Sequence, residues 1–117
     1  MNRRRTSASW QCPRPSRFAI LVVHEPHDVV LQLSGELDLG GAEALDACVV
    51  AVLSDQPRRL VLELSALTFV DIVGSRCFDE SRLRAEAADV QLILDSPSHA
   101  VRQVLELRGQ LDAFRIR

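Results

Sequence analysis

Hydrophobic and polar positions along the chain follow patterns that predict several strands. Residues 60–64 are apolar except for one glutamate, which is typical of a strand covered on both faces by helices. Residues 18–24 and 28–33 are rich in Val, Ile and Leu and flank a turn that contains Pro and Asp, so they predict a β-hairpin. Residues 90–94 predict another short strand and residues 111–116 a last one. The sequence therefore predicts a sheet of about four or five strands.

Between these strands, apolar residues recur at helical spacing. Residues 42–53 carry the clearest stripe, at i, i+3, i+4, i+7 and i+8. A second helix is expected from about Val73, and its buried stripe is Cys77, Phe78, Ser81, Ala85 and Ala88. A third helix is expected to open at Ser96-Pro97, with the serine as N-cap, and to stop at Gly109. This order of elements predicts an α/β domain with parallel neighbouring strands and one antiparallel hairpin.

Two aspartates follow predicted strands directly. Asp38 ends the segment Gly35-Glu36-Leu37-Asp38, and Asp71 follows the central strand. Each side chain can cap the free N–H groups of the next helix. Because both follow strands, both can lie on one edge of the sheet, where loops are free to meet a partner. The alternative for Asp38 is that it only caps the helix that begins near Gly40.

These residues resemble a known family, the STAS domain, which is named for sulphate transporters and anti-sigma-factor antagonists. The family pattern is an apolar strand, Asp or Glu, Leu, Ser, then an apolar pair and Asp-Ser-x-Gly at a helix start. The residues that match are Gly35-Glu36-Leu37-Asp38, Glu63-Leu64-Ser65, Phe69-Val70-Asp71 and Gly74. Ile72 stands in place of the serine, which a partner kinase phosphorylates in the regulated members of the family. The resemblance covers residues 18–116 and is strongest to the small, free-standing bacterial antagonists.

The resemblance implies a protein that binds an anti-sigma factor, of the ATP-binding serine-kinase type, and so releases a sigma factor. The implied contact residues are Asp38, Asp71, Ile72, Val73, Gly74 and Ser75. No phosphorylation is expected at Ile72, which has no hydroxyl, and Ser75 or Thr68 would be the nearest alternatives. A second hypothesis stays open, in which the chain is a non-catalytic STAS subunit of a larger assembly, such as a lipid-transport complex or a stress-signalling particle.

Charge divides the chain into two parts. All 14 basic residues are arginine, and five of them fall in residues 1–17 without any acidic residue. Residues 1–17 have the composition of a flexible basic tail. Residues 18–117 are long enough for one domain and hold nine Arg against 16 acidic residues, a net charge of about −7. This acidic body argues against nucleic-acid binding.

The sequence shows no catalytic or metal-binding constellation. It has no lysine, and its histidines are scattered at His24, His27 and His99. The three cysteines, Cys12, Cys48 and Cys77, are odd in number and lack C-x-x-C spacing, which argues against a disulfide framework or a zinc site. No apolar run is long enough for a signal peptide core or a membrane span. We therefore expect a cytoplasmic binding protein without enzymatic activity, cofactor, metal or direct membrane insertion, and the sequence gives no indication of its oligomeric state.

Overall fold

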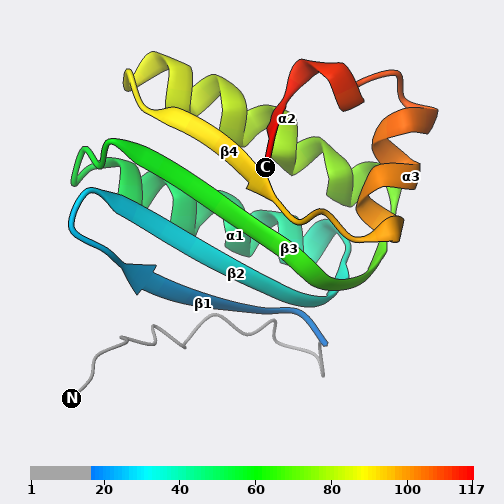
Figure 1. Cartoon of the computed structure of the whole chain (residues 1–117). Helices are drawn as coiled ribbons and strands as arrows, with labels where there is room; N and C mark the ends of the chain where they lie inside the picture. The colour runs from blue at the N-terminus through cyan, green and yellow to red at the C-terminus, as the bar shows by residue number, and fades with distance from the viewer. Residues whose placement is uncertain (1–16) are drawn as a thin grey trace.

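A five-stranded mixed sheet organises the fold, and the computed structural model describes residues 17–117 (Figure 1). The strands lie side by side in chain order: β1 (Ala19–His24), β2 (Asp28–Leu37), β3 (Arg59–Val70), β4 (Gln91–Asp95) and β5 (Arg115–Ile116). β1 runs antiparallel to β2, and every other neighbouring pair is parallel. The predicted α/β class and the hairpin are confirmed. The predicted basic tail, residues 1–17, lies outside the described residues except for Arg17.

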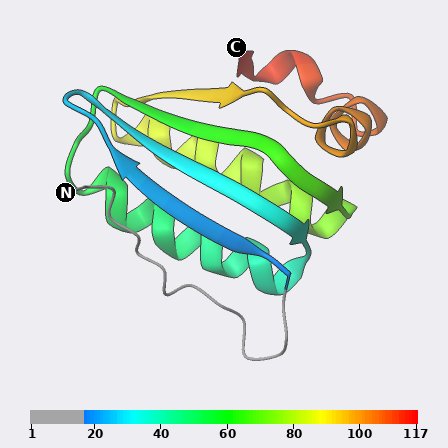
Figure 2. The same cartoon turned by 60° about the horizontal axis from the view of Figure 1, so that its bottom comes forward.

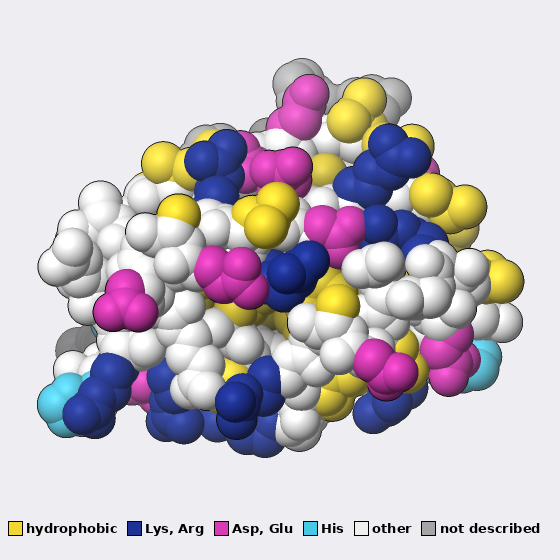
Figure 3. Space-filling model, turned by 90° about the horizontal axis from the view of Figure 1, so that it is seen from above, with side chains coloured by type: hydrophobic (Ala, Val, Ile, Leu, Met, Phe, Trp, Pro, Cys, Tyr) yellow, Lys and Arg dark blue, Asp and Glu magenta, His cyan; other side chains and the backbone are white. Residues whose placement is uncertain are grey.

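Three helices and a short 3₁₀ turn connect the strands. These are α1 (Leu39–Leu53), α2 (Ile72–Ala87), α3 (His99–Leu107) and η1 (Leu111–Ala113). Helices α1 and α2 lie side by side on one face of the sheet, and α3 follows the end of β4 (Figures 1 and 2). The apolar stripes predicted for α1 and α2 are buried against the sheet, except that Ala88, the C-cap of α2, is only partly buried. The outer surface over α2 carries charged side chains of both signs between hydrophobic ones (Figure 3).

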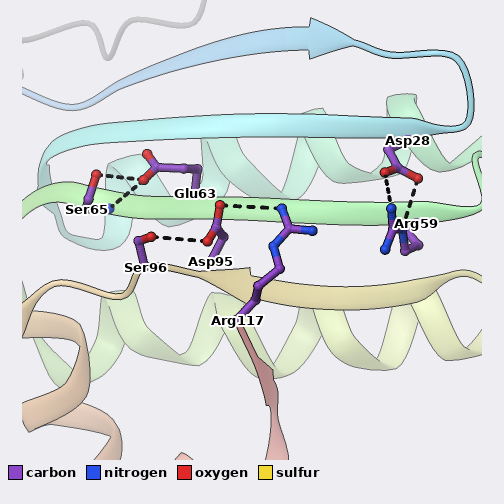
Figure 4. A network of polar contacts seen from close by, with 7 residues as sticks. All are labelled: Asp28, Arg59, Glu63, Ser65, Asp95, Ser96 and Arg117. Carbon is purple, nitrogen blue, oxygen red and sulfur yellow. Dashed lines mark hydrogen bonds and ion pairs between the residues drawn. The ribbon is translucent and has the colours of Figure 1, made fainter.

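The second face of the sheet is open, which corrects the prediction that helices cover both faces of β3. The core residues of its first half are Leu60, Leu62 and Leu64. Arg59 and Glu63 alternate with them and lie on the opposite face, where no helix of residues 17–117 covers them (Figure 4). There Arg59 forms an ion pair with Asp28 of β2, with 2.7 Å between nitrogen and oxygen. The sequence suggested a helix on this face because Val61, which also points to it, is apolar and buried.

Strand β2 is longer than residues 28–33, the range predicted from sequence. It continues to Leu37 beside β3, with shifts in register after Gln32 and after Gly35. Gly35 has φ of +93°, and a Cβ atom there would lie 1.4 Å from the carbonyl oxygen of Arg17. The glycine therefore permits the irregular second half of β2, which leads the chain to the N-cap of α1 at Asp38.

The start of α3 and the last strand also differ from prediction. The N-cap is Ser98, whose Oγ accepts the Val101 N–H at 3.3 Å, and the predicted cap Ser96 lies two residues earlier. Ser96 has φ of +52°, and its N–H donates to the carbonyl oxygen of Arg117 at 3.0 Å, so it belongs to the turn after β4. Gly109 follows the C-cap with φ of +67° and ends the helix as predicted. The final strand is only β5, because η1 occupies the first residues of the predicted range.

Candidate functional site

Two aspartates meet at the carboxyl end of the parallel strands. Asp38 follows β2 and Asp71 follows β3, and the last residues of these strands are paired across the sheet. Asp38 Oδ1 accepts the Gly41 N–H at 3.1 Å, and Asp71 Oδ1 accepts the Gly74 N–H at 2.5 Å. A carboxylate in this position satisfies a free N–H group and complements the positive end of the helix. The predicted capping of both helices is confirmed, and both caps lie on one edge of the sheet.

Gly74 brings the first turn of α2 against the end of β2. A Cβ atom at this position would lie 2.3 Å from the carbonyl oxygen of Leu37, much closer than any side chain permits. The same carbonyl accepts the Asp71 N–H at 3.3 Å. Gly74 is buried, which corrects its place among the predicted contact residues. It allows β2 and α2 to approach closely, and its neighbours in the chain form the surface.

Exposed apolar side chains lie beside this edge and line a groove of about 830 Å³. We call it the β3–α3 groove and define it by Phe69, Ile72, Val73, His99, Gln103 and Leu107. Ile72 is 52% exposed and Leu107 is 78% exposed. Seven large hydrophobic side chains are exposed among the described residues, and four of them share this groove. A concentration of this kind is typical of a surface that binds another molecule.

Ser75 does not belong to this surface, which corrects its place among the predicted contact residues. Its side chain is fully buried, at 0% exposure. The hydroxyl donates to the carbonyl oxygen of Ile72 at 2.8 Å and accepts from Arg108 Nη1 at 3.2 Å. A kinase could reach this oxygen only after α2 and α3 had separated. Thr68, the other alternative acceptor, is exposed on β3, and its hydroxyl donates to the carbonyl oxygen of Gly35 at 3.2 Å.

The two described cysteines lie in the core. Burial raises the pKa of the Cys48 thiol to about 11 and raises the pKa of the Cys77 thiol further. Both therefore stay protonated at neutral pH, as expected of small core residues rather than nucleophiles. Within residues 17–117, no three His, Cys, Asp or Glu side chains are grouped so that they could hold a metal ion. No helix in that range is both long and apolar enough to cross a bilayer.

The sequence did not point to four of the six residues that define the groove, Phe69, His99, Gln103 and Leu107, nor to Arg108, which lies outside it. In the sequence Phe69 belongs to the segment Phe69-Val70-Asp71 that matches the family pattern, and in the structure its side chain is half-exposed and lines the groove. The sequence could have indicated an exposed position at Leu107, because this apolar residue lies outside the buried stripe of α3. The sequence could not have indicated the role of Arg108, because its contacts with α2 depend on how two helices distant in sequence pack.

A family model described as the STAS domain matches residues 19–117. This chain belongs to the STAS domain family. The resemblance inferred from the strand-to-helix junction is thereby confirmed, as is the fold that it implied. The match includes every residue of the edge and of the β3–α3 groove.

Several known proteins similar to this STAS domain are named anti-sigma factor antagonists. The anti-sigma-F factor antagonist RsfB of Mycobacterium tuberculosis is 37% identical over 60 residues, which are 51% of this chain and 49% of the relative, so the chain spans about half the length of that relative. The crystal structure of an anti-sigma factor antagonist from Mycobacterium paratuberculosis gives a TM-score of 0.76 at 27% identity, covering 87% of this chain and 86% of that chain. The anti-sigma factor antagonist SpoIIAA in its unphosphorylated form gives 0.72 at 24% identity, covering 85% and 88%, and supports the fold alone.

Proposed function

We propose that this STAS domain is an anti-sigma-factor antagonist, which binds an anti-sigma factor and so releases a sigma factor. The names of its relatives support the class of partner. The observation that carries the proposal is the half-exposed Ile72 at the first position of α2, where the family pattern has serine. The docking surface consists of the β3–α3 groove and the adjoining edge at Asp38 and Asp71. The anti-sigma factor binds to this surface, and the STAS domain acts through this binding without catalysing a reaction.

The size of the expected contribution follows from exposure. Burying an isoleucine side chain completely contributes about 1.5–3 kcal/mol. Ile72 is 52% exposed, so a partner that covers it would gain roughly half of this amount, ~1 kcal/mol. Phe69, Val73 and Leu107 are exposed in the same groove and would add to it. A few clustered residues near the centre of an interface typically dominate its binding energy.

The partner in this proposal is of the ATP-binding serine-kinase type, but it does not switch this protein off at position 72. A phosphate there would add close to two negative charges beside the partner. Ile72 has no hydroxyl to accept it, and the hydroxyl of Ser75 is buried in contact with Arg108. The STAS domain is then always competent to bind, and its synthesis and competition between partners control the outcome.

The test compares two variants that carry the same change on the same helix. Ile72→Asp places a carboxylate in the groove, whereas Leu83→Asp places one at an equally exposed position of α2, also 52% exposed, outside it. Each variant is titrated against every anti-sigma factor kinase encoded in the source genome, by isothermal calorimetry. Because burying a charge without a partner is costly, Ile72→Asp should weaken binding well beyond about tenfold and Leu83→Asp by about twofold at most.

Two outcomes would contradict the proposal. Failure of the wild type to bind any of these kinases at micromolar concentrations would remove the class of partner. Equal losses from Ile72→Asp and Leu83→Asp would remove the groove as the docking surface. Recovery of a permease and ATPase pair as the specific partner would instead favour the hypothesis of a subunit in a larger assembly.

A further inference from the structure

Arg108 joins the end of α3 to α2 through two contacts. It is the C-cap of α3, and its side chain is only 17% exposed. Nη1 donates to Ser75 Oγ at 3.2 Å, and Nη2 donates to the carboxylate of Asp79. Ser75 and Asp79 are four residues apart on one side of α2, so the planar guanidinium binds across one helical turn. Lysine, with a single ammonium group, could not hold both positions in this way.

This connection leads directly to the β3–α3 groove. Beyond the contact with Arg108, the Ser75 hydroxyl donates to the carbonyl oxygen of Ile72 at 2.8 Å. At the other end, Leu107 precedes Arg108 in the chain. Ile72 and Leu107 come from different helices, and both line the groove. The series of contacts from Ile72 through Ser75 to Arg108 therefore joins its two sides.

The core packing of α3 ends at Leu105, two residues before the helix ends. Its buried residues are Val101, Val104 and Leu105, and Leu107 beyond them is exposed. The helix has nine residues, and Gly109, with φ of +67°, follows its C-cap. The Arg108 side chain adds polar contacts from this end of the helix to Ser75 and Asp79 of α2.

The Asp79 carboxylate depends on Arg108 for compensation. Its Oδ1 atom is buried and has no hydrogen-bond partner among the described residues. Arg82, one turn further along α2, does not supply it, because the Arg82 guanidinium lies 5.6 Å from the centre of the Phe114 ring and pairs with Glu86. A partly unsatisfied buried group of this kind costs stability, and such groups in native proteins call for an explanation other than stability.

We infer that Arg108 is a positioning residue for partner binding, which holds α3 against α2 and keeps the two sides of the β3–α3 groove at the spacing that the partner requires. The inference rests on the proposed function and adds a residue that is outside the docking surface. Arg108 does not contact the partner in this proposal. It acts through Leu107 on one side and through Ser75 and Ile72 on the other.

A second ion pair of α2 provides a matched control. Arg84 Nε and Nη2 donate to the two carboxylate oxygens of Asp46 at 2.8 and 3.2 Å and so join α2 to α1. This pair is also an Arg–Asp ion pair between α2 and a neighbouring helix, but its side chains are more exposed and it lies away from the groove. Arg84→Met therefore removes a bridge between helices without changing the contact between α2 and α3.

The experiment measures Arg108→Met, Arg108→Lys and Arg84→Met in the full chain. Amide hydrogen exchange without a partner should rise about tenfold at residues 72–75 and 105–109 in Arg108→Met, and should stay unchanged there in Arg84→Met. Affinity for the anti-sigma factor kinase bound by the wild type should fall about tenfold in Arg108→Met, recover in part in Arg108→Lys, and stay within about twofold in Arg84→Met. Because Arg84→Met also removes an ion pair between α2 and another helix, the contrast between the two Met variants separates positioning from a general loss of stability.

The inference is overturned if Arg108→Met and Arg84→Met change exchange and affinity equally, or if Arg108→Met changes neither. In that case Ile72→Asp can still abolish binding, and the proposed function survives. If Ile72→Asp has no effect, the docking surface fails, and the exchange experiment alone decides whether Arg108 ties the helices together. Should Arg108→Met not fold, Ser75→Ala removes only the hydroxyl link and leaves the ion pair with Asp79, and faster exchange at residues 72–75 is then expected. Exchange in Ser75→Ala equal to that of the wild type would overturn the inference.

Discussion

Replacing Gly74 with alanine has two effects of opposite sign on the free energy of unfolding. Alanine is favoured over glycine inside a helix by about 1 kcal/mol. Its Cβ, however, would lie 2.3 Å from the carbonyl oxygen of Leu37 and 2.9 Å from the carbonyl carbon. A tolerable carbon–oxygen contact is about 3.3 Å, so the first turn of α2 would have to move about 1 Å away from β2. Overpacking a core typically destabilises a protein by about 1–3 kcal/mol. Because the atoms opposite Gly74 belong to the backbone and cannot change rotamer, we expect the destabilisation from this clash to lie at or above the upper end of that range.

We therefore expect Gly74→Ala to lower the free energy of unfolding by roughly 2 kcal/mol, the clash outweighing the helical preference. Urea unfolding followed by circular dichroism measures this. The control is Gly109→Ala, where φ is +67° and no atom lies within 4 Å of the added Cβ, so only backbone strain of about 1 kcal/mol applies. A Gly74→Ala variant as stable as the wild type, or more stable than Gly109→Ala, would refute the close approach of α2 to β2.

Two further predictions concern charge. The hydrogen bond from Arg59 holds the pKa of Asp28 below its ordinary value of 3.8. The stability that this ion pair contributes is complete above pH 3.8, and it is lost as the pH falls through the lower pKa of the folded state. The stability advantage of the wild type over Arg59→Met in urea unfolding should therefore shrink below about pH 4, and an advantage that is constant with pH would contradict this. The second prediction is that the partner kinase with ATP phosphorylates the Ile72→Ser variant and leaves the wild type unmodified in mass spectrometry. A stoichiometric phosphate on the wild type, at Thr68 or Ser75, would contradict it.

Local chemistry explains why the strand-to-helix edge could be predicted from sequence. A capping aspartate needs only the N–H groups of the next turn, so the roles of Asp38 and Asp71 follow from residues within three positions. The stripe of α1 is similarly determined by its own periodicity. The order of elements then fixed the fold class, since strands joined by helices pair in parallel.

Contacts between distant segments explain the errors. Ser96 and Ser98 are equally good caps in isolation, and the N–H of Ser96 is engaged by Arg117, 21 residues further along the chain. Ser75 has the local setting of an exposed first-turn serine, but Arg108, 33 residues away, covers it. Val61 suggested a strand buried on both faces, but its neighbours on this face are its cross-strand partners Val30 and Ile93 rather than a helix.

The start of α2 keeps the backbone features of the family pattern, while its first side chain differs from that pattern. Asp71 and Gly74 keep the cap and the close approach to β2, so the backbone of the first turn is held as the family pattern requires. Ile72 then offers an apolar side chain at the surface, and the next hydroxyl, that of Ser75, points inward to Arg108. Because the cap occupies the Gly74 N–H, the turn is stabilised without any added anion. In the proposed function, Ile72 therefore gives the partner an apolar contact in place of a hydroxyl that could be phosphorylated, and we expect occupancy to follow the concentrations of the two proteins rather than a modification of this one.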